Sequence, residues 1–117
     1  MEFIQYEKCS TCQKAKKFLE SNKVSFKNRS IIEETPTKEE LTKWIKDYNI
    51  DIKKLFNTSG LVYKEMKLKE KLDHLTMDEK IALLASNGKL IKRPLLVKED
   101  GILIGFKEKE YQELIRG

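Results

Sequence analysis

The chain has 117 residues, 39% of them hydrophobic and 37% charged, with a formal net charge of +5 at pH 7, and this length predicts a single domain over residues 1–117. No apolar run approaches the roughly 20 residues of a membrane-spanning helix, which argues against a membrane protein. The amino terminus MEFIQYEKC lacks the basic region and the apolar region of a signal peptide, so the sequence predicts a cytoplasmic protein. The basic residues are interspersed with acidic ones, as in KEEL and KEKE, so direct nucleic-acid binding is not expected, and the charge favours an acidic protein surface or an anionic thiol such as glutathione.

The first third of the chain predicts a strand, a helix and a second strand. Phe3–Tyr6 is short, apolar and aromatic, as strands are, and Ser10–Ser21 carries apolar residues at near-helical spacing. A second strand is predicted over Val24–Ile32, running into a loop at Thr35-Pro36. This order is typical of a βαβ unit with a parallel pair of strands.

The middle of the chain, about residues 37–88, is predicted to be a helical insertion. Thr37 stands three residues before Glu40, and Thr76 stands three residues before Glu79. This is the spacing of a capping box, in which a hydroxyl and a carboxylate satisfy free backbone N–H groups at the start of a helix. Two capped helices are therefore expected in the insertion.

Turn residues divide the rest of the chain. NTSG at 57–60 interrupts Ile52–Leu72, which predicts short helices joined by a turn, and Asn87-Gly88 is predicted to end the second capped helix. Two β-rich runs flank Asp100-Gly101 and predict a tight antiparallel hairpin, because both turn residues tolerate a positive φ. KEKEYQELIRG predicts a final helix. The expected order is βαβ, a helical insertion and ββα, an α/β fold with a mixed four-stranded sheet.

The two cysteines, Cys9 and Cys12, lie where the first strand becomes the first helix. Free N–H groups and the helix dipole stabilise a thiolate there, and three neighbouring lysines add positive potential, so the pKa of Cys9 is expected to be lowered. These lysines are Lys8, Lys14 and Lys16. Cys9 is predicted to be the catalytic nucleophile, and Cys12 the resolving thiol that releases the product as an intramolecular disulfide closes.

Two other uses of the cysteine pair compete with redox chemistry. A structural zinc site needs about four ligands, and beyond the cysteines the sequence offers one histidine, His74, so no metal site is expected in a monomer. His74 is assigned a surface or capping position. Two inert buried cysteines are the remaining alternative, but Cys-Ser-Thr-Cys at the junction of a strand and a helix in a βαβ unit favours redox chemistry.

Arg93-Pro94 is the second candidate feature. An X–Pro bond is where a cis peptide occurs, and a cis-proline loop facing the cysteine helix would expose backbone to an extended thiol substrate, whose negative charge Arg93 could hold. The alternative is a trans Pro94 that starts an edge strand beside a solvated Arg93, and the local sequence leaves both open. Thr11, between the cysteines, is grouped with Arg93 and Pro94 as a substrate-binding residue.

YEKCSTCQKAKKFLE, LFNTSGLVYKEM, LASNGKLIKRPLLV and ILIGFKEKE together resemble the arsenate reductase-related family. That family includes glutaredoxin-coupled arsenate reductases and the Spx and MgsR regulators. The resemblance covers nearly the whole chain. It implies a thioredoxin- or glutaredoxin-like fold with a helical insertion, a catalytic or regulatory Cys9, and a cis Pro94 beside it.

Two departures from the family patterns bear on function. The reductases use further arginines to bind the oxyanion, whereas the matching positions here hold Ser59 and Gly105-Phe106. The neighbouring Lys64 and Lys107 lack the planar guanidinium fork. In the Spx-like members an arginine follows the second cysteine, and Gln13, which can hydrogen-bond but cannot balance charge, stands there in this chain.

The cysteine pair and the resemblance predict a thiol–disulfide oxidoreductase. We expect it to act as a monomer on a thiol or disulfide substrate such as glutathione. No bound cofactor is expected, and glutathione, thioredoxin or glutaredoxin would donate the electrons. A redox-sensing transcription regulator that binds the α-subunit of RNA polymerase through its helical insertion is one alternative, and an arsenate reductase is another.

Overall fold

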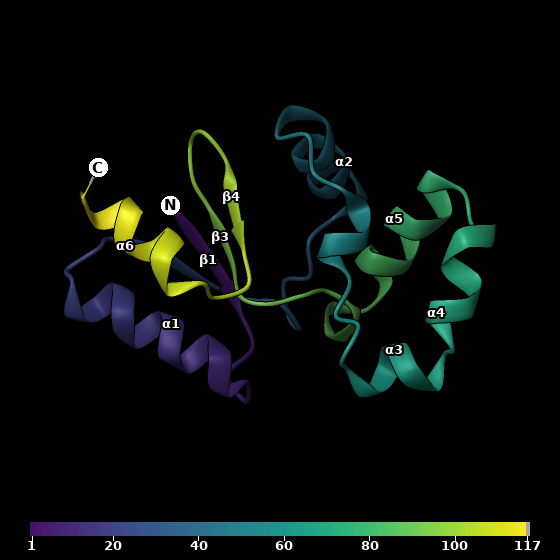
Figure 1. The fold of residues 1–117 in the computed structure, drawn as a ribbon, viewed down its shortest axis with the longest axis horizontal. Helices are drawn as coiled ribbons and strands as arrows, with labels where there is room; N and C mark the ends of the chain where they lie inside the picture. Colours follow the sequence, from purple (N-terminus) through teal and green to yellow (C-terminus); the bar gives the residue numbers. More distant parts are fainter. Residues whose placement is uncertain (117) are drawn as a thin grey trace. The chain divides into compact units, whose positions relative to one another are not determined.

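The computed structural model describes residues 1–116 (Figure 1). The chain divides into two compact units, one made of residues 1–30 together with the segment from 93 onward, and the other of residues 31–92. The second unit contains the whole helical insertion that the sequence predicts. That residues 1–117 form a single domain stays a prediction.

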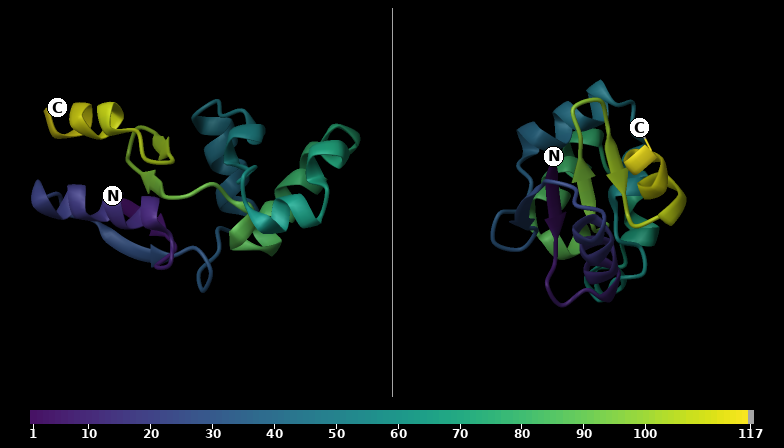
Figure 2. Two further views of the ribbon diagram at one scale, coloured as in Figure 1. Left: turned by 60° about the horizontal axis from the view of Figure 1, so that its bottom comes forward. Right: turned by 90° about the vertical axis from the view of Figure 1, so that its left-hand side faces the viewer.

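The first unit is an open sheet with two helices (Figure 2). Its elements are β1 (Glu2–Gln5), α1 (Ser10–Ser21), β2 (Lys27–Ser30), β3 (Leu95–Val97), β4 (Ile102–Ile104) and α6 (Glu108–Arg116). The strand order is β2-β1-β3-β4, with β1 parallel to β2 and antiparallel to β3, and β3 antiparallel to β4. The mixed four-stranded sheet and the βαβ and ββα connections are therefore confirmed.

One face of this sheet forms the core of the unit. Phe3 of β1 pairs with Leu96 of β3, and Leu96 pairs with Leu103 of β4, so the three side chains share a face. Residues of α1 and α6 pack against them. The fully buried members of this cluster are Phe3, Ala15, Leu19, Leu96 and Tyr111. This packing fixes α1 on the sheet, with its first turn directly after the carboxyl end of β1.

β1 has the predicted length but lies one residue earlier than Phe3–Tyr6, and β2 is shorter than the sequence predicts. Within the predicted Val24–Ile32, only Lys27–Ser30 pairs with β1. Phe26 instead packs edge-on against the ring of Phe3, with the ring centroids 5.4 Å apart. Ile31 is buried in the turn that follows β2. The apolar residues at both ends of the predicted strand therefore lie outside the paired residues of β2.

The hairpin of β3 and β4 is confirmed, but the turn differs from the prediction. Lys98 N–H donates to the Gly101 carbonyl at 2.8 Å, which centres the turn on Glu99 and Asp100. Gly101 has no positive φ. The expected left-handed Asp-Gly turn is therefore wrong, because the strands pair one residue earlier than the turn residues suggest.

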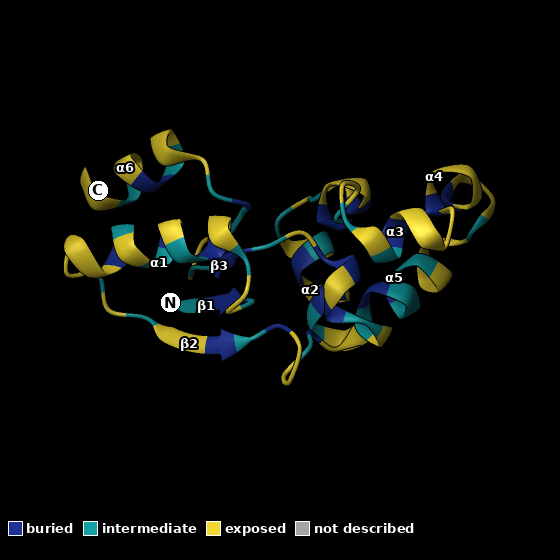
Figure 3. Cartoon of the chain, turned by 90° about the horizontal axis from the view of Figure 1, so that it is seen from below, coloured by how far each residue is buried: buried dark blue, intermediate teal, exposed yellow. Residues whose placement is uncertain are grey.

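The second unit is helical. Its elements are α2 (Lys38–Asp47), η1 (Ile52–Leu55), α3 (Leu61–Glu65), α4 (Leu68–Lys71), η2 (Leu72–His74), α5 (Met77–Ser86) and η3 (Gly88–Leu90). Both predicted capping boxes are present: Glu40 N–H donates to Thr37 Oγ1 and Glu79 N–H donates to Thr76 Oγ1, each at 3.1 Å. Buried positions alternate with exposed ones along α2 and α5, which pack together (Figure 3).

α5 ends before Asn87-Gly88, as predicted, but the two residues do not form a left-handed helix end. The C-cap residue Asn87 is extended, with φ −156°, and does not adopt the left-handed conformation of many helix ends. A Cβ atom added to Gly88 would lie 2.1 Å from the carbonyl oxygen of Ile31. The glycine is therefore required by close packing of two backbone segments.

Candidate active site

Cys9 is the N-cap residue of α1. Its backbone is extended, with φ −94° and ψ 118°, and its N–H donates to the carbonyl of Tyr6 at 3.0 Å. The Cys9 Sγ accepts a hydrogen bond from the backbone N–H of Cys12 at 3.4 Å. The sulfur therefore takes the place of the serine or aspartate oxygen that commonly caps a helix, and it satisfies one free N–H of the first turn.

The environment lowers the pKa of Cys9. Burial of the thiol acts in the opposite direction, but hydrogen bonds from the thiol and the backbone N–H of Cys12, and the hydrogen bond and charge of the Arg93 guanidinium, outweigh it. The predicted lowering and the role of the helix start are thus supported. The cation responsible is Arg93 and not the neighbouring lysines.

The environment raises the pKa of Cys12, in contrast to that of Cys9. It is fully buried in α1, and both cysteines are free thiols. Burial, together with the thiol and charge of Cys9, raises the pKa of Cys12 to about 12, although the Tyr6 backbone acts in the other direction. At neutral pH Cys9 is therefore the better source of a thiolate, and Cys12 keeps its proton.

The raised pKa of Cys12 predicts a loss of stability at alkaline pH. Between pH 9.0, the ordinary value, and about pH 12, the unfolded chain gives up this proton and the folded chain retains it. The free energy of unfolding should therefore fall through this window by up to about 1.4 kcal/mol per pH unit, while the contribution is fully present below it. Urea unfolding of wild type and Cys12→Ala, under reducing conditions, would measure this difference. An equal loss in both proteins would contradict the assignment.

Arg93 and Pro94 precede β3 in the sheet unit. The bond between them is cis, the isomer that the family resemblance implies. The Arg93 Cζ lies 5.0 Å from the centroid of the Tyr6 ring, within cation–π range. Among the residues that the structure describes, Arg93 Nε and Nη1 are buried and have no hydrogen-bond partner. The guanidinium thus has donors left for an anionic group.

Pro94 and Thr11 are the other two residues that the sequence predicts to bind substrate. The buried Pro94 uses its carbonyl to accept a hydrogen bond from Gly105 N–H at 2.8 Å, which ties the proline to the end of β4. Thr11 is exposed at the second position of α1. Their substrate-binding roles stay predictions, while the structure brings Cys9, Cys12 and Arg93 together.

Comparison with known proteins identifies the chain. The sequence model of the ArsC family matches residues 4–114. The chain belongs to the ArsC family. This ArsC-family protein is 47% identical over 113 residues to YusI of Bacillus subtilis (strain 168), covering 97% of the chain and 96% of YusI. Regulatory protein MgsR of the same organism is 30% identical over 114 residues, covering 97% of the chain and 89% of MgsR.

A solved structure supports membership of the ArsC family. An ArsC family related protein from Bacteroides fragilis matches with a TM-score of 0.91 and 55% identity, over 97% of this chain and 95% of that one. The thioredoxin-like α/β fold that the sequence predicts is therefore confirmed.

The positions where this ArsC-family chain departs from the reductase pattern serve other purposes. Phe106 packs at right angles to the Tyr111 ring, with the ring centroids 4.8 Å apart, and belongs to the core of the sheet unit. In the helical unit Ser59 is exposed, and its hydroxyl donates to Asn57 Oδ1 at 3.4 Å. His74 is exposed at the end of η2, as expected.

Tyr6 is a site residue that sequence reasoning missed. Its ring stacks on Arg93, and its carbonyl accepts from Cys9 N–H. The signal was an aromatic residue at the end of a strand three positions before a cysteine. An aromatic residue at this position is also typical of an ordinary core strand, so the sequence does not distinguish a site residue from a core residue.

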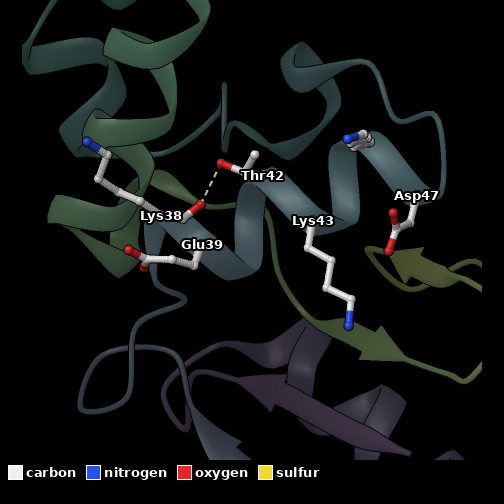
Figure 4. Close-up of a pocket in the computed structure, with 6 residues that line it drawn as sticks. Lys38, Glu39, Thr42, Lys43 and Asp47 are labelled. Atoms are coloured by element: carbon white, nitrogen blue, oxygen red, sulfur yellow. Dashed lines mark hydrogen bonds between the residues drawn. The ribbon is translucent and has the colours of Figure 1, made fainter.

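A pocket of about 610 Å³ lies along α2 (Figure 4). It is lined by Lys38, Glu39, Thr42, Lys43, Lys46 and Asp47. Over residues 1–116 no helix has the length and apolar character needed to cross a membrane, and no cluster of three or more metal-binding side chains is found.

Proposed function

We propose that this ArsC-family protein is a thiol–disulfide oxidoreductase in which Cys9 is the nucleophile and Cys12 the resolving thiol. The observation that carries the proposal is the opposite tuning of two thiols at one helix start. Cys9 caps the helix with a lowered pKa, while the buried Cys12, whose N–H reaches the Cys9 sulfur at 3.4 Å, has its pKa raised to about 12. A reactive thiolate beside a protonated thiol suits a two-step exchange.

In the first step the Cys9 thiolate attacks one sulfur of a substrate disulfide. A bond forms between Cys9 Sγ and that sulfur, the substrate disulfide breaks, and the second substrate sulfur leaves as a thiolate that takes up a proton. In the second step Cys12 loses its proton and attacks Cys9 Sγ, which closes the Cys9–Cys12 disulfide and releases the remaining substrate thiol. The substrate gains two electrons and the protein loses two.

A second thiol source returns the protein to its free-thiol state. Two molecules of glutathione, or the dithiol of a thioredoxin or glutaredoxin, would supply the two electrons, so no bound cofactor is needed. Arg93 supports the first step in two ways. Its charge stabilises the Cys9 thiolate, and its buried Nε and Nη1 atoms offer donors to a carboxylate on the substrate, as glutathione carries. We propose that the protein acts as a monomer in the cytoplasm.

The test is to trap the mixed disulfide. With glutathione disulfide as the substrate, Cys12→Ser should accumulate one glutathione on Cys9, while the wild type should form the intramolecular disulfide. Intact mass and peptide mapping would distinguish these products. Absence of the adduct in Cys12→Ser, with no intramolecular disulfide in the wild type, would contradict the proposal.

A redox-sensing regulator is the second candidate, favoured by the 30% identity to regulatory protein MgsR. In this reading the helical unit contacts an acidic protein surface, such as one on the α-subunit of RNA polymerase. The pocket along α2 is lined by three lysines and two acidic residues, so its lining keeps one net positive charge for such a surface. Pull-down with reduced and oxidised protein would decide, because a regulator should hold its partner in only one redox state.

Arsenate reduction is the third candidate. The core position of Phe106 and the exposed Ser59 give it less support, since neither side chain supplies the guanidinium expected for an oxyanion. Arsenate-dependent oxidation of a reduced glutaredoxin would establish it, and no oxidation at saturating arsenate would remove it.

A further inference from the structure

The side chain of Gln13 links the turn before Cys9 to the sheet. Its Nε2 donates to the carbonyl of Glu7 at 2.9 Å and to Gln5 Oε1 at 3.4 Å. Gln5 is only 1% exposed in β1, and its own Nε2 donates to Asn28 Oδ1 of β2 at 3.1 Å. A chain of amide hydrogen bonds thus runs from the turn through two paired strands.

The turn held by Gln13 joins the Tyr6 ring, which contacts Arg93, to the nucleophile Cys9. It begins at Tyr6, whose ring lies 5.0 Å from Arg93 Cζ, and ends at Cys9. Glu7 lies between them, and its carbonyl is the stronger of the two acceptors for Gln13. Because Tyr6 precedes Glu7, movement of the Glu7 peptide would shift the Tyr6 ring, and with it Arg93, relative to the Cys9 sulfur.

The backbone of Gln13 fixes the same turn from the other side. Its N–H donates to the carbonyl of Cys9 at 3.1 Å, in the first turn of α1. Backbone and side chain of one residue therefore hold the turn on both sides of Lys8. Because the side chain of Gln13 is neutral, it adds no charge beside the thiolate and leaves Arg93 as the cation that acts on it.

We propose that Gln13 is a positioning residue for the Cys9 nucleophile: its side-chain amide fixes the Glu7 carbonyl and so keeps Arg93 in place beside the sulfur. The inference rests on the proposed function, in which Cys9 is the attacking thiol. The effect of Gln13 is carried by the turn and by Arg93.

The test is the pH dependence of Cys9 alkylation by iodoacetamide, with the modified site read by mass spectrometry. The groups that act on the thiol are Cys12 of α1 and Arg93 before β3, and Glu7 and Lys8 precede it in the turn. In Gln13→Met the midpoint of the alkylation rate against pH should move to higher pH. The alkylation rate of Cys9 at pH 7 should fall about three- to tenfold, because one or two positioning hydrogen bonds are lost.

Three further variants keep the test decisive. Gln112→Met, at an exposed position of α6, makes the same chemical change and should leave the profile unchanged. Gln5→Met removes the 3.4 Å bond from Gln13 and the 3.1 Å bond to Asn28 but keeps the bond from Gln13 to Glu7, so it should shift the rate less than Gln13→Met. Gln13→Asn keeps an amide that is one methylene too short, and it should behave like Gln13→Met.

Each outcome has a separate meaning. An unchanged profile in both Gln13 variants, with thermal unfolding showing that they fold, overturns the positioning role and leaves the proposed function standing. An equal shift in Gln112→Met also overturns it. If the wild-type midpoint itself lies at the ordinary thiol value, the proposed function is what fails.

Discussion

Cys9→Ser is expected to abolish disulfide reduction, lowering its rate by at least about a thousandfold, because a serine hydroxyl does not ionise near neutral pH and forms no mixed disulfide. The measurement is the rate of thiol release from a mixed disulfide of glutathione and a small peptide, with reduced glutathione in excess. The remaining thiol, Cys12, does not replace the lost thiolate, because it is fully buried and burial is the largest cause of its raised pKa.

Cys12→Ser is the matched control, because it makes the same atomic change one turn along the same helix. It should keep the first step at close to the wild-type rate in a single turnover, since Cys9 and Arg93 remain. A wild-type rate in Cys9→Ser, together with an inactive Cys12→Ser, would exchange the roles of the two thiols. Loss of the first step in both would indicate that the Cys12 thiol itself activates Cys9.

Local signals in the sequence predicted the part of the site that lies within one helix. The bounds of α1, Ser10–Ser21, agree with the prediction, and both capping boxes form. In each case the interacting groups are about three residues apart, as with Cys12 N–H and Cys9 Sγ. Spacing of this kind is visible in the sequence because the helix geometry relates the two positions directly.

Contacts between distant parts of the chain could not be predicted in this way. The sequence assigned the cation at Cys9 to neighbouring lysines, whereas the structure brings Arg93 there from the start of β3. The cis state of Pro94 was open on local grounds and came only from the family resemblance. The close approach of Gly88 to Ile31 is another such contact, since a glycine in the sequence does not show which backbone will pack on it.

Arg93→Met is expected to raise the pKa of Cys9 and to slow its reaction at neutral pH about tenfold to a hundredfold, because removal of a cation beside a thiolate favours the protonated form. The direction follows from the causes of the present lowering: burial opposes it, and without the guanidinium only the Cys12 hydrogen bonds remain to counter that burial. Alkylation rates of Cys9 between about pH 5 and pH 9 would give both the rate and the midpoint.

Two substitutions separate the guanidinium from positive charge in general. Lys8→Met removes one positive charge next to Cys9 in sequence and should change the alkylation rate of Cys9 against pH only a little. An effect as large as that of Arg93→Met would indicate that the neighbouring lysines, and not Arg93, lower the pKa of Cys9. Arg93→Lys keeps the charge and loses the planar fork over the Tyr6 ring, so an intermediate midpoint is expected. If Arg93→Lys matches the wild type in alkylation but loses turnover with glutathione, the buried Nε and Nη1 donors serve the substrate and the charge alone serves Cys9.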